Sequence, residues 1–170
     1  MPMHERSKLG IAYLPQESSI FQNLSVKDNI LGLAQLSSDD NKAILSRFNK
    51  VVEEFNLSSI LMQKGRELSG GQRRRVEIAR CLVTMPKIIL MDEPFAGIDP
   101  IAVDDIKKIL NQLVSQGISI LITDHNVSAA LEICSRGLIL SEGQVLAEGT
   151  TEELINNPKV REVYLGEMYS

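Results

Sequence analysis

Tryptophan is absent from the 170-residue sequence, and aromatic residues make up only 4% of it. The two cysteines, Cys81 and Cys134, are not arranged as C-x-x-C, which argues against a metal site or a redox centre. No apolar run approaches the roughly 18 residues that a membrane span needs, and the polar first residues lack the apolar stretch of a signal peptide. We therefore expect a cytosolic chain in a reducing compartment, with both thiols buried as small apolar residues.

The sequence also has no excess of positive charge. Its formal net charge is -4, which argues against general binding to nucleic acids or membrane surfaces. The hydrophobic content of 44% is ordinary for one globular domain with a real core. One local basic cluster is better explained by a phosphate or a partner protein: Arg66, Arg73, Arg74, Arg75 and Arg80. We expect no nucleic-acid partner.

A further absence is G-x-x-x-x-G-K-[ST], the loop whose amides and lysine hold nucleotide phosphates. A different glycine motif is present, because residues 68–72 read LSGGQ and three arginines follow at 73–75. Two adjacent glycines let a backbone approach a ligand closely, Ser69 can cap the next helix, and the first amides of that helix form an anion site. The alternative is a solvated helix start whose arginines are balanced by Glu67 and Glu77.

Three short apolar segments are expected to form strands, at residues 10–14, 88–91 and 119–123. Each is followed by polar side chains: Gln16 after the first, Asp92 and Glu93 after the second, and His125 after the third. Ligands of open α/β sheets gather at the carboxyl ends of the strands, so these side chains are candidate site residues. The second and third segments are typical of interior strands. The alternatives are a carboxylate pair that merely ends a strand and a structural histidine.

The remaining pattern predicts helices and one hairpin. Helices are expected from Ser25, at 39–55, at 72–84, from Asp99 to Gly117, after Asn126 and as a short tail at 163–167. The helix at 39–55 has an apolar stripe formed by Ile44, Phe48, Val51, Val52 and Phe55. Residues 138–141 and 145–148 predict a β-hairpin joined by Glu142 and Gly143.

Together these segments resemble, in order and spacing, the motifs of ATP-binding-cassette (ABC) ATPases. The matching motifs are a Q-loop at Gln16, the signature at 68–72, Walker B at 88–93, the D-loop at 96–99 and a switch histidine at His125. The resemblance implies that ATP binds with Mg²⁺, which Asp92 and Gln16 hold largely through water. It further implies that Glu93 is the general base for the attacking water and that His125 contacts the γ-phosphate.

The resemblance also implies a homodimer of ATPase subunits, in which each signature binds the γ-phosphate of a nucleotide held mainly by the other subunit. The signature residues in this role are Ser69, Gly70, Gly71 and Gln72. Asp99 would communicate between the two nucleotide sites. Phe21 would line the groove that receives a coupling helix of a transmembrane permease, although an aromatic residue before a capped helix can also be a hydrophobic staple.

The implied fold is α/β, namely a P-loop-NTPase-like ABC nucleotide-binding domain with a mainly parallel sheet, helices and a helical subdomain. Only fifteen residues precede Gln16, so we expect residues 1–170 to be a partial domain without its N-terminal Walker A part. Residues 17–67 would form the mostly helical subdomain, and residues 68–170 would hold the other motifs and the tail. We expect the isolated chain to be poorly stable, with an open sheet face, and to have no significant ATPase activity.

Within the family, the closer resemblance is to lipopolysaccharide-export ATPases. It rests on residues 13–17, 19–21, 92–97, 123–127 and 163–167. It implies permease subunits of a lipopolysaccharide-export complex as partners and a location on the cytoplasmic face of the inner membrane. The alternative is a branched-chain amino-acid importer, which shares residues 124–127.

Two other classes stay open. A catalytically inactive fragment would act only in subunit pairing, since the sequence lacks the phosphate loop. A DNA-repair or chromosome-structure ATPase would share LSGGQ, but such proteins place long coiled coils or zinc modules between the sites, and residues 17–67 contain neither.

Overall fold

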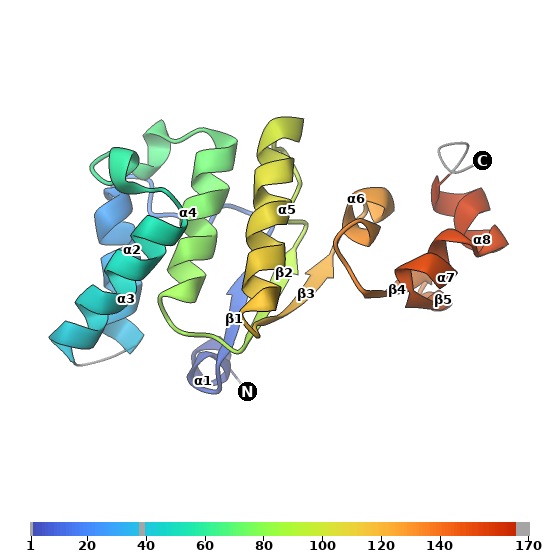
Figure 1. Ribbon diagram of the computed structural model, residues 1–170, viewed down its shortest axis with the longest axis horizontal. Coiled ribbons are helices and arrows are strands. Elements are labelled where there is room, and N and C mark those ends of the chain that lie inside the picture. The colour runs from blue at the N-terminus through green and yellow to red at the C-terminus, as the bar shows by residue number, and fades with distance from the viewer. Residues whose placement is uncertain (1, 38–39, 166–170) are drawn as a thin grey trace. The chain divides into compact units, whose positions relative to one another are not determined.

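The computed structural model describes residues 2–37 and 40–165, and the chain divides between Thr123 and Asp124 into two compact units (Figure 1). The first unit contains α1 (Met3–Lys8), β1 (Ile11–Leu14), α2 (Val26–Ser37), α3 (Asn41–Glu54), the short 3-10 turns η1 (Ser58–Ile60) and η2 (Gly65–Glu67), α4 (Gly70–Leu82), β2 (Ile88–Asp92), α5 (Pro100–Ser115) and β3 (Ser119–Thr123). The second unit contains α6 (Val127–Leu131), β4 (Arg136–Ser141), β5 (Gln144–Thr150), α7 (Thr151–Ile155), α8 (Pro158–Val160) and the helical turn η3 (Arg161–Leu165).

The first unit is built on a parallel sheet with the strand order β1-β2-β3. Leu14 lies opposite Met91, and Met91 lies opposite Ile122, so the three strands end at the same edge. Helices α4 and α5 pack against each other and against β1 and β3 respectively, as Figure 1 also shows. Parallel strands need crossover connections that return the chain to the starting end of the sheet. Helix α4 belongs to the connection between β1 and β2, and α5 to the connection between β2 and β3.

One face of the sheet is buried and the other is not. Ile89 and Met91 are buried, together with the inner faces of α4 and α5. On the opposite face Tyr13, Leu90 and Leu121 lie side by side in register, and Tyr13 is 44% and Leu121 56% exposed. The open sheet face that the family resemblance predicted is therefore present.

The predicted interior position is confirmed for β2, which pairs with both β1 and β3, but β2 is not buried on both faces, since Ile88 is 38% exposed. The prediction is wrong for β3, which within the described residues pairs with β2 alone, as an edge strand. Side chains of a strand point alternately to the two faces of the sheet, and in this unit α4 and α5 cover one of them. An apolar run shows that a strand has side chains suited to burial. It does not show which other elements pack over them.

The helix boundaries differ slightly from the predicted ones, for local reasons. Helix α4 begins at Gly70, two residues before the prediction, because Ser69 caps it, and it ends before Met85, which has a φ of +58°. Helix α3 begins after Asp40, whose side chain accepts from the amide of Lys42. Helix α1 was not predicted, because its polar residues show no apolar periodicity.

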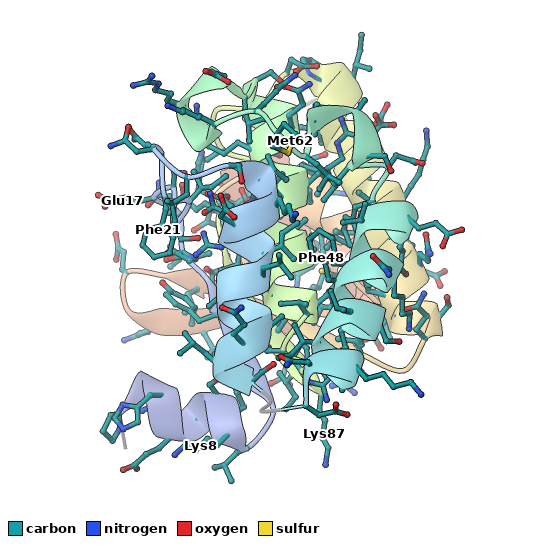
Figure 2. The ribbon with its side chains drawn as sticks, turned by 90° about the vertical axis from the view of Figure 1, so that its left-hand side faces the viewer. Lys8, Glu17, Phe21, Phe48, Met62 and Lys87 are labelled. Atoms are coloured by element: carbon teal, nitrogen blue, oxygen red, sulfur yellow. The ribbon has the colours of Figure 1, made fainter. Side chains whose placement is uncertain are left out.

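Helices α2 and α3 pack against each other and against α4. The predicted apolar stripe of α3 is buried throughout, and Figure 2 shows Phe48 between α2 and α3. Ser25 caps α2 as predicted, because its hydroxyl accepts from the amide of Asp28 and donates to the carboxylate of Asp28. No helix in the part of the chain that the structure describes combines the length and the apolar character that crossing a membrane requires.

The second unit contains the predicted hairpin, formed by β4 and β5. Its turn residues Glu142 and Gly143 both have positive φ, at 49° and 76°, as the mirror-image turns that suit hairpins require. A small core consists of Leu131, Ile139, Leu154 and Val160. The helical tail is present up to residue 165, and the rest of the predicted segment at 163–167 lies outside the described residues.

The prediction that both thiols are buried needs correction, because Cys81 and Cys134 are each half-buried. The Sγ of Cys81, on α4, lies 3.9 Å from the carbonyl oxygen of Tyr13 on β1. Burial in this environment raises the pKa of Cys81 to about 11 and also raises the pKa of Cys134. Neither thiol is therefore an activated nucleophile.

The raised pKa predicts how Cys81 reacts. In a Cys134→Ser variant, alkylation of Cys81 by iodoacetamide should accelerate about tenfold per pH unit from pH 7 to 10, because only the thiolate reacts. In urea, the rate should level off near the ordinary pKa of about 8.5. The measurement is the pH profile of the labelling rate by mass spectrometry, and a plateau below pH 10 in the folded chain would contradict the assignment.

The asymmetry of the sheet predicts unequal costs for two similar truncations. Ile89→Ala removes a buried side chain and should lower the free energy of unfolding by about 2–5 kcal/mol. Leu121→Ala acts on the open face and should cost about 1 kcal/mol or less. Urea unfolding monitored by circular dichroism compares them, and equal losses would show that both faces are packed.

Candidate functional site

Gln16 and Glu93 meet at the carboxyl edge of the sheet. Pro15 ends β1 and Gln16 follows it, and the Nε2 of Gln16 donates to Oε2 of Glu93 over 2.6 Å. Glu93 has a φ of +43°, in the left-handed region that non-glycine residues rarely adopt, and its amide donates to the carbonyl oxygen of Thr123 over 2.7 Å. Strained backbone of this kind is concentrated at functional sites, and pattern reasoning from the sequence could not detect it.

Asp92 lies beside this pair at the end of β2. Its Oδ1 accepts from the hydroxyl of Thr123 over 2.6 Å, and its Oδ2 lies 3.4 Å from the hydroxyl of Tyr13. Both strands that flank β2 therefore orient the carboxylate. Neither Tyr13 nor Thr123 was predicted as an orienting residue. Thr123 lies opposite Asp92, and Tyr13 lies opposite Leu90, two residues before Asp92 on the same face, so both follow only from the register of the sheet.

These donors fit Mg²⁺. Within the described residues there is no cluster of three or more metal-ligating side chains. Mg²⁺ does not need one, because it keeps several waters and is held by one or two carboxylates together with substrate phosphates. The carboxylate of Asp92 and the amide oxygen of Gln16 are hard oxygen ligands of that type, and Gln16 uses its nitrogen for Glu93.

The signature residues begin α4 with a reciprocal cap. The hydroxyl of Ser69 accepts from the amide of Gln72 over 3.3 Å, and the side-chain oxygen of Gln72 accepts from the amide of Ser69 over 3.0 Å. Gln72 thus has a structural role that the sequence analysis did not assign. The amides of the first helical turn give this end of α4 a positive partial charge.

The two glycines of the signature differ in their surroundings. A Cβ on Gly71 would lie 2.6 Å from the Cβ of Ala102 on α5, closer than carbon atoms can approach. A Cβ on Gly70 would lie 3.4 Å from the carbonyl oxygen of Gly97. Gly71 is therefore needed for close packing of α4 on α5, in addition to any contact with a ligand.

Two small clefts flank the start of α4. One, of about 90 Å³, is lined by signature residues together with Asp99, Ala102, Arg75 and Asp105. The other, of about 150 Å³, brings Gly70 to the same cavity as Gln16 and Glu93. Both are smaller than the roughly 300 Å³ at which ligand pockets usually begin.

The interpretation of the arginines as phosphate or partner contacts is wrong for Arg74 and Arg80, because both are buried. Nη1 of Arg74 lies 3.3 Å from the carboxylate of Glu77, which is also buried. The same guanidinium donates to the carbonyl oxygens of Pro15 and Asp92, over 3.1 and 3.4 Å. The alternative that Glu77 balances the arginines is therefore correct for Arg74. The helix start is not solvated there, because the pair is buried.

Phe21 is 57% exposed, in the loop beside α2 that Figure 2 shows, so it does not act as a buried staple. Its backbone is fixed by Asn29, whose amide accepts from the Phe21 nitrogen over 2.9 Å and donates to the Phe21 oxygen over 3.0 Å. Asn29 is 1% exposed and was missed by the sequence analysis. The guanidinium carbon of Arg80 lies 5.1 Å from the centre of the Phe21 ring, which is cation-π distance.

His125 is the second residue of the second unit and directly precedes Asn126. The Asn126 side chain accepts from the amide of Ala129 over 3.1 Å and so caps α6, as predicted. The carboxylate of Asp124 accepts from the Asn126 amide over 2.8 Å. These bonds fix the turn that carries His125, and its role stays a prediction.

Comparison with known proteins identifies the family. Residues 2–96 match the family described as "ABC transporter", and residues 144–170 match one described as "Branched-chain amino acid ATP-binding cassette transporter". The chain belongs to the ABC transporter family. It has the α/β fold of the ATPase domains of this family and resembles a crystal structure of the ADP conformation of MJ1267, an ATP-binding cassette of an ABC transporter, with a TM-score of 0.81 and 31% identity. That match covers 96% of this chain and 71% of the other.

Curated members of the family are closer in sequence. The lipopolysaccharide export system ATP-binding protein LptB of Haemophilus influenzae is 48% identical over 170 residues, which are 99% of this chain and 70% of the relative. LptB of Escherichia coli K12 is 49% identical over 168 residues, which are 98% of this chain and 70% of the relative. This ABC ATPase chain is therefore close to LptB in sequence along nearly its whole length.

The contact between α4 and α5 predicts that the two signature glycines are not equivalent. Gly71→Ala should lower the free energy of unfolding by about 1–3 kcal/mol, because the new methyl group overlaps Ala102. Gly70→Ala is the matched control and should cost less. Adding Ala102→Gly to Gly71→Ala should restore part of the loss, and urea unfolding of the single and double variants measures this coupling. Equal effects of the two glycine substitutions would exclude the packing role.

Proposed function

We propose that this chain is the C-terminal portion of the ATP-hydrolysing subunit of an ABC transporter that drives lipopolysaccharide export. The identity of 48–49% to LptB along nearly the whole chain supports this substrate. The observation that supports a hydrolytic function is the pairing of Gln16 with Glu93 at the carboxyl edge of a parallel sheet, beside Asp92. Hydrolysis of ATP requires charge neutralisation and a group that orients the attacking water, and these side chains can provide both.

In the proposed mechanism, Glu93 accepts a proton from the attacking water and Gln16 orients that water. The direct bond of 2.6 Å from Gln16 to Glu93 shows that the two side chains reach one position, and the attacking water would replace this bond and lie between them once nucleotide binds. Asp92 and the amide oxygen of Gln16 would hold Mg²⁺ largely through water, and the ion would neutralise charge on the phosphates. His125 would contact the γ-phosphate from the turn after β3.

We further propose that the nucleotide lies between two ATPase subunits. Ser69, Gly70, Gly71 and Gln72 would contact the γ-phosphate bound mainly by the other subunit, through the amides at the start of α4. Asp99, which shares a cleft with the signature residues, would communicate between the two sites. Clefts of about 90 and 150 Å³ are consistent with this arrangement, because each is smaller than the roughly 300 Å³ at which ligand pockets usually begin.

Phe21 is proposed as the contact for the transmembrane permease. It is exposed as a side chain while its backbone is fixed by Asn29, a combination that suits an aromatic anchor at an interface. The chain would then work at the cytoplasmic face of the inner membrane, held there by permease subunits of the export complex. The helical segment at 17–67 would serve as its coupling subdomain.

A second candidate function is branched-chain amino-acid import, which the match of residues 144–170 favours. The two functions differ in the permease that the ATPase binds. Complementation distinguishes them: if lipopolysaccharide export is correct, this chain joined to the N-terminal segment of the H. influenzae relative should support growth of an E. coli strain depleted of LptB, and Phe21→Ala should abolish that support. Growth restored only in a strain that lacks its amino-acid importer ATPase would favour the second function.

The catalytic proposal predicts a specific pattern of Mg-ATP turnover. The isolated chain lacks the phosphate loop in its sequence, so we expect no turnover from it. Joining the N-terminal segment of the H. influenzae relative ahead of Met1 should give turnover, and Glu93→Gln in that protein should lower kcat at least 100-fold, as loss of a general base does. Phosphate release is the measurement.

The control for this substitution is Glu142→Gln, in the exposed hairpin turn, which should leave kcat unchanged. Turnover by the isolated chain that Glu93→Gln abolishes would show that nucleotide can be held without the phosphate loop. Turnover that survives Glu93→Gln in the joined protein would exclude Glu93 as the base.

A further inference from the structure

The loop that carries Gln16 and Phe21 is held to α4 by buried polar groups. Oε1 of Glu77 accepts from the hydroxyl of Ser18 over 2.8 Å and from the amide of Ser19 over 3.0 Å. Nη1 of Arg80 donates to the carbonyl oxygen of Ser19 over 2.5 Å. At the other end of the loop, Arg74 donates to the carbonyl oxygen of Pro15. Gln16 therefore lies inside a segment whose backbone is attached to α4 on both sides.

Glu77 is at the centre of these contacts. Its side chain is 3% exposed, and one carboxylate oxygen binds the loop while the other faces Arg74. A buried carboxylate is costly unless it is paired and hydrogen-bonded, and here the charged partner comes from α4 while the neutral donors come from the loop. If the loop left α4, Ser18 and Ser19 would no longer satisfy this carboxylate. Detachment of the loop is thus opposed by the charge of Glu77.

We propose that Glu77 is a positioning residue that fastens the loop of residues 15–21 to the signature helix, so that Gln16, Phe21 and the start of α4 move as one body. The importance of this attachment for transport rests on the proposed function, in which Phe21 contacts the permease and Gln16 orients the attacking water. A displacement of Phe21 by the permease would then reach Ser69 through one rigid connection along α4. In this proposal Glu77 acts through the loop that it holds, and not through the chemical step.

The alternative is that Glu77 only stabilises the fold. The two roles differ in where a substitution acts: a positioning role predicts local release of the loop while the sheet stays protected, and a purely structural role predicts loss of protection throughout. Amide hydrogen exchange resolves this difference residue by residue. The absence of tryptophan from the sequence adds a second readout, because Phe21→Trp places the chain's single tryptophan at the loop, where its fluorescence can be excited selectively.

The experiment compares Glu77→Ala with Glu53→Ala, an exposed glutamate on α3, in the complete chain. We expect exchange of the Ser19 amide to accelerate about 10- to 100-fold in Glu77→Ala, the factor that corresponds to losing hydrogen bonds to a charged group. The amides of β2 should stay protected. In the Phe21→Trp background, fluorescence anisotropy should fall with Glu77→Ala and stay unchanged with Glu53→Ala. Glu77→Gln retains one acceptor oxygen and should restore part of the protection.

Ser19 exchange and anisotropy that are the same in Glu77→Ala and Glu53→Ala would overturn the proposal. If Glu77→Ala unfolds the chain, Ser18→Ala decides, because it removes one loop donor and leaves the buried pair of α4 intact. Faster Ser19 exchange in Ser18→Ala supports the fastening role, and unchanged exchange excludes it. None of these measurements needs ATP or a permease. A negative result here would therefore not contradict the proposed function, and a negative turnover test would not contradict the role of Glu77 in holding the loop.

Discussion

The parallel register of β1, β2 and β3 is the constraint on which the candidate site depends. Because Leu14, Met91 and Ile122 lie opposite one another, the residues that follow them are brought to one edge of the sheet. Gln16 can then reach Glu93 over 2.6 Å although 77 residues separate them in the chain. A slip of one residue would turn every side chain to the other face and separate these groups. The chemistry of the site is thus fixed by strand pairing, before any ligand binds.

Much of this arrangement could be predicted from the sequence. The strands, the cap at Ser69 and the apolar stripe of α3 follow from local patterns, and the carboxyl-edge rule puts Asp92 near Gln16. The left-handed backbone of Glu93 and the clamp of Asn29 on Phe21 could not be predicted, because both depend on contacts between distant segments. The open face of the sheet was inferred from family resemblance. The apolar pattern of a strand could not predict it, because that pattern does not show which elements pack against the strand.

The arginines at 73–75 show most clearly where pattern reasoning stops. A row of cations at the start of a helix is unfavourable beside the positive end of the helix dipole. A bound anion or a nearby carboxylate could offset this repulsion equally well, and the sequence does not distinguish the two. The structure separates the three: Arg73 donates to the carbonyl oxygen of Leu68, Arg74 is buried against Glu77, and Arg75 lines a small cleft with Asp99. Helical periodicity explains part of this division, since residue 74 lies one turn from residue 77, whereas residue 75, two positions from it, points to another side of the helix.

Helix α4 therefore has two functions that are separated along its length. Its first turn begins with Gly70 and Gly71, and the absence of a side chain on Gly71 allows close approach to Ala102. Its second and third turns bury charged side chains that hold the loop between β1 and α2. A helix is stiff over this distance, so under the proposed connection a force applied at the loop would be delivered at the glycines without a change in helix structure. The buried charges of α4 fix the position of the loop more narrowly than apolar contacts would. Apolar contacts tolerate small shifts of the loop along the helix, whereas directional hydrogen bonds are lost when the loop shifts.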